Sequence, residues 1–170
     1  TVTPGKLTVA TSPDFAPYEF YAIGEDRTPK LAGFDMDLAQ YIADYLGLEL
    51  EVVTVDFDGV ISELQTKSVD LGMAGLSPDE KRMGIMDFSD LYYMGGQSLV
   101  TVKDNAEKYN SFEAINKPDV SVGAQVGSIQ MDLANENSPE ADIVGLPKVT
   151  DIISELLTGK MDAAYIETDV

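Results

Sequence analysis

The chain has 170 residues, and its 11 Lys and Arg against 30 Asp and Glu give a formal charge of −19 at pH 7. A surface this acidic repels phosphate, which argues against nucleic acid or an anionic membrane as a partner. The chain has no His and no Cys, which excludes Ser-His-Asp and Cys-His catalysis, His or thiolate metal sites, and disulfides.

The spacing of apolar residues alternates between that of strands and that of helices. In the first half it predicts strands at 7–11, 50–55 and 69–74, a helix over 38–46 that Gly47 terminates, and a helix over 60–64. In the second half it predicts strands at 97–102, 120–124, 143–146 and 163–167, and helices over 128–136 and 150–158. Strands separated by helices predict βαβ units with parallel sheets, an α/β fold.

One segment of the chain is repeated. Residues 61–70 match residues 153–162 without a gap, and Ile, Ser, Glu, Leu, Thr and Asp recur at the same places. Each copy ends a helix, turns and enters a strand, and the order of elements upstream also recurs. Chance similarity between two amphipathic turns is the alternative. Two similar α/β units imply two lobes, which we place at residues 1–102 and 103–170.

Ligands of open parallel sheets bind beyond the carboxyl ends of the strands. In two facing lobes these ends would line a cleft. Ala74-Gly75 and Glu167 end the two repeated strands, so we expect them there. A carboxylate that ends an apolar strand needs a cation or water, and for Glu167 a ligand ammonium and bulk solvent are the two candidates.

The segment Ser77-Pro78-Asp79-Glu80 has the pattern of a helix start, with Ser77 as N-cap and Glu80 completing a capping box. Arg82 lies on the first turn of this helix. Free backbone N–H groups and a guanidinium would together bind a carboxylate. A capped helix with a solvated Arg82 is the alternative.

A second helix start, Gly127-Ser128, lies at the corresponding place in the second half, close to Gln125. It could donate N–H groups to the same anion, or be an ordinary N-cap. Phe15 and Phe57 lie at element ends, where they could line a pocket or belong to the core. We expect the segment 35–37, Asp-Met-Asp, to cap the helix that follows it. The chain has neither a GxGxxG nor a GxxxxGK[ST] motif, and we expect no cofactor and no metal.

Several stretches in combination carry a family resemblance: residues 7–20, 33–39, 70–82, 87–93, 122–128 and 159–164. The most specific are Gly-Phe-Asp-Met-Asp-Leu-Ala and Asp-Phe-Ser-Asp-Leu-Tyr-Tyr. On these motifs the chain resembles the extracytoplasmic, or periplasmic, solute-binding proteins of ABC importers, in the polar amino-acid branch. The resemblance implies a type II periplasmic-binding-protein-like fold, in which two lobes each hold a mainly parallel sheet flanked by helices.

The function implied by this resemblance is binding of a free L-amino acid, polar neutral or cationic, by hinge closure in an interlobe cleft. The chain would deliver it to a membrane permease, act outside the cytoplasm and catalyse nothing; its signal segment would be absent. The resemblance also implies a site in which the α-carboxylate meets Arg82, Gly75, Ser77 and Gly127-Ser128, the ammonium meets Glu167, and Phe15 and Phe57 stack on the side chain. Ser12 stands where many members have Asp, although Asp14 is close by.

The family pattern continues past the position of Val170. We therefore expect the C-terminal part of the fold to be missing, both lobes to be incomplete, and a swapped or partner-completed dimer to form. Two other functions stay open. One is a cyclohexadienyl or arogenate-type dehydratase with Glu167 or Asp14 as general acid. The other is the ligand-binding sensor domain of a receptor.

Overall fold

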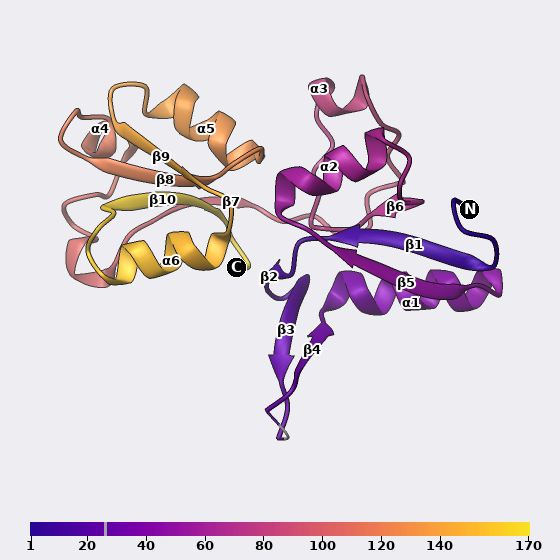
Figure 1. The fold of residues 1–170 in the computed structure, drawn as a ribbon. Helices are drawn as coiled ribbons and strands as arrows, with labels where there is room; N and C mark the ends of the chain where they lie inside the picture. Colours follow the sequence, from indigo (N-terminus) through magenta and orange to yellow (C-terminus); the bar gives the residue numbers. More distant parts are fainter. Residues whose placement is uncertain (26) are drawn as a thin grey trace. The chain divides into compact units, whose positions relative to one another are not determined.

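The computed structural model describes residues 1–25 and 27–170 (Figure 1). The chain divides into two compact units, Thr1–Tyr93 (unit 1) and Met94–Val170 (unit 2). The sequence placed this boundary after residue 102. The observed division comes earlier because the strand β7 (Gln97–Val100) pairs with a strand of unit 2.

Unit 1 is built on a three-stranded parallel sheet in the order β5-β1-β6. Its strands are β1 (Lys6–Thr11), β5 (Glu49–Thr54) and β6 (Leu71–Gly72), and its longer helices are α1 (Phe34–Leu46) and α2 (Phe57–Gln65). Alternate residues of β1 point to opposite faces. Val9 packs with Ala39 of α1, whereas Ala10 packs with Val60 of α2. One helix therefore covers each face of the sheet.

The sequence analysis did not predict the second, antiparallel sheet of unit 1. It consists of β2 (Asp14–Phe15), β3 (Glu19–Ile23) and β4 (Pro29–Ala32), in the order β2-β3-β4. The outer end of β3 is exposed, with Ile23 at 74%. A two-residue strand and a solvated hairpin leave little periodic signal. The remaining helix of unit 1 is a single turn, α3 (Glu80–Met83).

Unit 2 contains a four-stranded sheet in the order β7-β10-β8-β9. The strands β8 (Ser121–Gln125), β9 (Asp142–Leu146) and β10 (Ala163–Glu167) are parallel, and β7 runs antiparallel to β10. The helices are α5 (Ile129–Asn137) and α6 (Val149–Leu157), with two short turns, η1 (Lys103–Asn105) and α4 (Phe112–Ile115). The predicted α/β architecture with mainly parallel sheets is thus confirmed in each unit.

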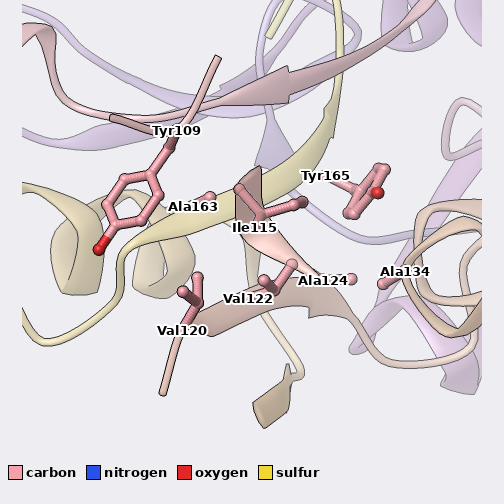
Figure 2. Packing of buried hydrophobic residues seen from close by; sticks show 8 residues of the cluster. All are labelled: Tyr109, Ile115, Val120, Val122, Ala124, Ala134, Ala163 and Tyr165. Atoms are coloured by element: carbon pink, nitrogen blue, oxygen red, sulfur yellow. The ribbon is translucent and has the colours of Figure 1, made fainter. Parts of the chain in front are cut away.

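A core cluster of unit 2 lies on one face of its sheet (Figure 2). Val122 and Ala124 of β8 face Ala134 of α5 in this cluster, and Ile115 of α4 is fully buried beside them. Tyr165 keeps its hydroxyl in the core by pairing with Ser138 Oγ at 3.0 Å. The other face is covered by α6, whose Ile152 lies against Gly123 of β8.

The repeated segments fold in the same way. Thr66 and Thr158 follow α2 and α6, and their hydroxyls donate to the carbonyls of Ser62 at 3.0 Å and Ser154 at 2.8 Å. The next residue has a positive φ in both copies, +58° at Lys67 and +71° at Gly159. Matching geometry at each step favours an internal duplication over chance similarity.

Candidate functional site

The predicted site residues of unit 1 lie in the segments that follow the carboxyl ends of its parallel strands. These residues are Ser12, Asp14, Phe15, Phe57, Ala74, Gly75, Ser77 and Arg82. This is the edge at which open α/β sheets bind their ligands.

Arg82 is the buried cation of this group, with only 7% of its side chain exposed. Its guanidinium Nη1 donates to the Ser77 carbonyl at 2.7 Å, and its Nε lies 3.2 Å from Asp79 Oδ2. Its Cζ also lies 5.7 Å from the centroid of the Phe57 ring. Three neighbours thus fix the orientation of a planar donor suited to a carboxylate.

The helix start around Arg82 differs from the prediction. The N-cap of α3 is Asp79, whose Oδ1 accepts the Arg82 N–H at 2.8 Å, and it is not Ser77. Asp79 can bond both the backbone and the guanidinium of Arg82, whereas a serine hydroxyl at 77 could not form the ion pair. The predicted capping box is therefore wrong, and a one-turn helix adds little dipole. The fixed guanidinium remains as the candidate group for binding an anion.

Gly75 has a left-handed backbone conformation that makes a turn in the site. Its φ is +57°, and a Cβ added there would lie 2.7 Å from Phe15 Cε1. Phe15 in turn stacks on Tyr18, with ring centroids 5.4 Å apart. Glycine is required at this position both for its backbone conformation and for the close approach of the ring.

The other residues of unit 1 have mixed roles. Phe57 and Ala74 belong to a core cluster of unit 1, so of Ala74 only the backbone can serve a ligand. Ser12 is 2% exposed, and its hydroxyl donates to Asp14 Oδ1 at 2.7 Å. This bond orients the Asp14 carboxylate.

In unit 2 the predicted residues Gln125, Gly127, Ser128 and Glu167 lie at the carboxyl ends of the neighbouring parallel strands β8 and β10. Ser128 is the N-cap of α5, as predicted: its Oγ accepts the Met131 N–H at 3.3 Å and donates to the Gln125 carbonyl at 2.7 Å. The Gln125 amide donates to the Pro147 carbonyl at 3.0 Å.

Glu167 ends β10 and is 8% exposed. Its Oε2 accepts the Asp169 N–H at 2.8 Å. Its Oε1 is buried and has no hydrogen-bond partner among the residues that the structure describes. A buried carboxylate oxygen with no donor is costly unless a cation approaches it.

The sequence analysis did not include in the candidate site two polar groups that the structure brings close to its residues. Gln97, at the start of β7, pairs with Glu167 in the sheet register and accepts a hydrogen bond from Gln130 Nε2 at 2.6 Å. Asp35 was expected to cap α1, but it is fully buried and accepts the Gly75 N–H at 3.1 Å. The Gly75 N–H therefore serves Asp35 and not a ligand. In the sequence, the only indication that Asp35 is buried is its position between two apolar residues, Phe34 and Met36.

Within residues 1–25 and 27–170, His, Cys, Asp and Glu form no group of three that could hold a metal ion. No helix in the same described ranges is long and apolar enough to span a bilayer.

Residues 7–141 match the bacterial extracellular solute-binding proteins, family 3. The chain belongs to this family. The predicted resemblance and the type II periplasmic-binding-protein-like fold are both confirmed by this match and by the solved relatives.

Among the curated relatives of this family 3 chain, the arginine-binding extracellular protein ArtP of Bacillus subtilis is 35% identical over 164 residues, which are 95% of this chain and 61% of ArtP. Cyclohexadienyl dehydratase of Pseudomonas aeruginosa is 29% identical over 160 residues, 93% of this chain and 58% of the enzyme. The chain thus spans about 60% of the length of these relatives.

Among solved structures, an amino acid ABC transporter substrate-binding protein from Streptococcus pneumoniae, bound to L-arginine, matches with a TM-score of 0.91 and 37% identity. The match covers 96% of this chain and 67% of that protein.

Proposed function

We propose that this chain binds a free L-amino acid with a cationic side chain, L-arginine foremost, and presents it to the permease of an ABC importer outside the cytoplasm. The observation that carries the proposal is the buried Arg82 guanidinium, held by Phe57, Ser77 and Asp79 at the ligand-binding edge of unit 1. ArtP and the pneumococcal protein are both described by their binding of arginine.

Within this proposal, Arg82 meets the ligand α-carboxylate, because a guanidinium and a carboxylate form a bidentate pair. The buried and unpartnered Oε1 of Glu167 meets the α-ammonium. The first turn of α5, after Gly127-Ser128, adds backbone donors for the carboxylate.

The preference for a cationic side chain is supported by one acidic site residue and by the acidic character of the whole chain. Asp14 is held in place by Ser12 at the end of β1, and the chain carries 30 acidic residues against 11 basic ones. Phe15 offers a ring for stacking, an arrangement that suits a guanidinium.

A calorimetric titration with L-arginine, L-lysine, L-histidine, L-glutamine and L-glutamate tests this proposal. We expect L-arginine to bind tightest and L-glutamate not to bind, because Asp14 repels its side chain. No heat of binding with any of the five would overturn the proposal, and so would a preference for L-glutamate.

A second candidate function, that of a dehydratase, is favoured by the similarity to cyclohexadienyl dehydratase. We propose that the chain is not such an enzyme, because Glu167 and Asp14, the carboxyls suggested as general acids, are better explained as ligand contacts. Release of phenylpyruvate from prephenate at a rate that Glu167→Gln abolishes would establish the dehydratase instead.

The partner-completed or swapped dimer stays a prediction. It is supported by two hollows on unit 2, of about 670 and 490 Å³, which share Val100 of β7 and the following Thr101 in their linings. Leu156, Leu157 and Ile166 line the smaller hollow, and apolar linings of this kind favour a partner. Light scattering should give the mass of a dimer, and a compact monomer at micromolar concentration would contradict the prediction.

A further inference from the structure

Unit 1 contains a buried acidic side chain that the site described so far does not use. Glu19, the first residue of β3, is fully buried. Neither of its carboxyl oxygens accepts a hydrogen bond from any donor in the described part of the chain. The Asp35 N–H donates to the carbonyl of Tyr18, the residue before Glu19, at 2.9 Å, and the two carboxyl groups lie together.

Asp35, in contrast, is supplied with donors. Its Oδ2 accepts the Gly75 N–H at 3.1 Å, and its Oδ1 accepts the Tyr92 hydroxyl at 2.9 Å. Bonds of this kind stabilise the ionised form of a carboxyl group. Two carboxylates in contact away from water do not both ionise, so one of them must carry a proton. The distribution of donors gives the charge to Asp35 and the proton to Glu19.

The position of Asp35 gives this pair a functional role. Gly75 lies three residues after β6 and two residues before Ser77, whose carbonyl accepts a hydrogen bond from Arg82, and Tyr92 lies one residue before the end of unit 1. Asp35 therefore ties the turn beside the candidate carboxylate site to the segment by which the chain leaves unit 1.

We infer that Glu19 is protonated at neutral pH and donates its proton to the Asp35 carboxylate, and that this acid pair holds the Gly75 turn in position for the ligand. In this role Asp35 is a positioning residue, and the ligand part of the inference rests on the proposed function.

The titration behaviour of the surrounding groups agrees with this geometry. Burial, and then the negative charge of Asp35, raise the pKa of Glu19 to about 11, and Asp14 adds to this effect. Burial also raises the pKa of Asp35, while Gly75, Tyr92 and Glu19 lower it through their hydrogen bonds. The pKa of Tyr92 is raised by burial and by Asp35, so its hydroxyl stays a donor.

The protonation of Glu19 can be tested without any ligand. An infrared difference spectrum at pH 7 between the wild-type chain and Glu19→Gln should contain the C=O stretching band of a protonated carboxylic acid, lost in the variant. The same comparison with Glu49→Gln, an exposed residue of β5, should lack this band. Absence of the band in the Glu19 comparison would overturn the protonation.

The positioning role is tested by the affinity for L-arginine. We expect Asp35→Asn to weaken binding about tenfold, which corresponds to losing one hydrogen bond to a charged group. Glu19→Leu, which removes one of the donors to Asp35, should weaken binding similarly, and Glu19→Gln should recover most of the loss because its amide can donate. Asp37→Asn, an exposed acid on the same helix turn, is the matched control and should bind like the wild-type chain.

A pH profile separates positioning from general stability. The wild-type affinity should fall at acidic pH as Asp35 takes up a proton, and Tyr92→Phe should shift this fall to higher pH because Asp35 loses a donor. Wild-type affinity in Asp35→Asn, or an unshifted profile in Tyr92→Phe, would overturn the positioning role. Failure of the wild-type chain to bind L-arginine would overturn the proposed function and, with it, this ligand role, while the infrared result would stand.

Discussion

Asp70 holds Thr8 by two hydrogen bonds: its carboxylate Oδ2 accepts the Thr8 N–H at 2.9 Å, and its own N–H donates to the Thr8 carbonyl at 2.8 Å. Asp162 makes the same two bonds to Ser121, both at 3.0 Å. In each unit an aspartate before the repeated strand therefore aligns the neighbouring parallel strand. The aspartate recurs in the duplicated sequence for this structural reason and not for ligand binding.

The first prediction concerns this aspartate in unit 2. Asp162→Ala should lower the free energy of unfolding by about 1–3 kcal/mol, because it leaves the Ser121 N–H and the Tyr109 hydroxyl without their acceptor. Urea denaturation measures the change. Asp142→Ala, an exposed position at the start of β9, is the control and should change stability little. Equal losses in the two variants would contradict the strand-aligning role.

The second prediction uses the difference between the two repeats at the helix end. Lys67 has a φ of +58°, and Gly159 has a φ of +71° at the equivalent place. A side chain in this conformation costs about 1–2 kcal/mol. Lys67→Gly should therefore raise the unfolding free energy by about 1 kcal/mol. Gly159→Ala should lower it by a similar amount, because a Cβ at 159 meets no atom within 4 Å and only the backbone responds.

Thermal denaturation of both variants measures these changes. Because the two substitutions act in opposite directions on equivalent positions, a decrease in stability for Lys67→Gly would show that the lysine side chain contributes more than its backbone conformation costs.

The third prediction concerns the Gly75 turn. Gly75→Ala should lower stability by about 1–3 kcal/mol and weaken ligand binding, because it adds a strained φ and a contact with the Phe15 ring. Gly5→Ala is a matched control: Gly5 has a φ of +80° but open space around its Cβ position. The difference between the two variants measures the cost of the Phe15 contact. Equal costs would mean that the ring moves aside freely.

The fourth prediction is the dependence of stability on pH through Glu19. The pKa of Glu19 rises from its ordinary value to about 11 on folding. Between these values the native chain binds a proton that the unfolded chain has released, so stability should fall as pH rises, with a limiting slope of about 1.4 kcal/mol per pH unit. Glu19→Gln removes this proton uptake. The variant should lose less stability than the wild-type chain between pH 5 and 8.

Urea denaturation at several pH values measures this slope, with Glu49→Gln as the exposed control. If the slope stays the same in Glu19→Gln, the carboxyl group of Glu19 ionises normally in the folded chain.

The fifth prediction assigns the two charged ligand contacts separately. Arg82→Ala should weaken L-arginine binding by about 2–5 kcal/mol, the range for removing one partner of a buried charge pair. It should barely change binding of agmatine, which lacks the α-carboxylate. Glu167→Gln should weaken L-arginine binding but leave 5-guanidinopentanoate, which lacks the α-ammonium, unaffected. Calorimetry of the two variants with the three ligands gives the full comparison.

If Arg82→Ala weakens the binding of L-arginine and of agmatine equally, Arg82 does not meet the carboxylate. If Glu167→Gln weakens the binding of L-arginine and of 5-guanidinopentanoate equally, Glu167 does not meet the ammonium.

Much of the fold could be predicted because hydrophobic periodicity survives in long, buried elements. The strands β1, β5 and β10 and the helices α5 and α6 were all predicted to within a few residues. The sheet of β2, β3 and β4 was missed because its strands are short and partly solvated. The unit boundary was placed too late because the pairing of β7 with β10 depends on residues far apart in sequence.

The candidate site could be predicted only where local patterns mark it. The N-cap Ser128 was found because capping depends on neighbouring residues. Asp79, the observed N-cap of α3, was missed in favour of Ser77. Its second contact, the ion pair with the Arg82 side chain, depends on side-chain geometry that sequence spacing does not reveal. The contact between Glu19 and Asp35 joins a strand to a helix, and no periodicity in the sequence connects the two.

The pairing of β7 with β10 also determines where a fragment that contains unit 2 should begin. A fragment that begins at residue 103 would strip β10 of its antiparallel neighbour and leave a row of open backbone groups that invites aggregation. A fragment for expressing unit 2 alone, or for exchanging it between family members, should therefore start at Met94. Such a fragment keeps β7 together with the sheet of unit 2.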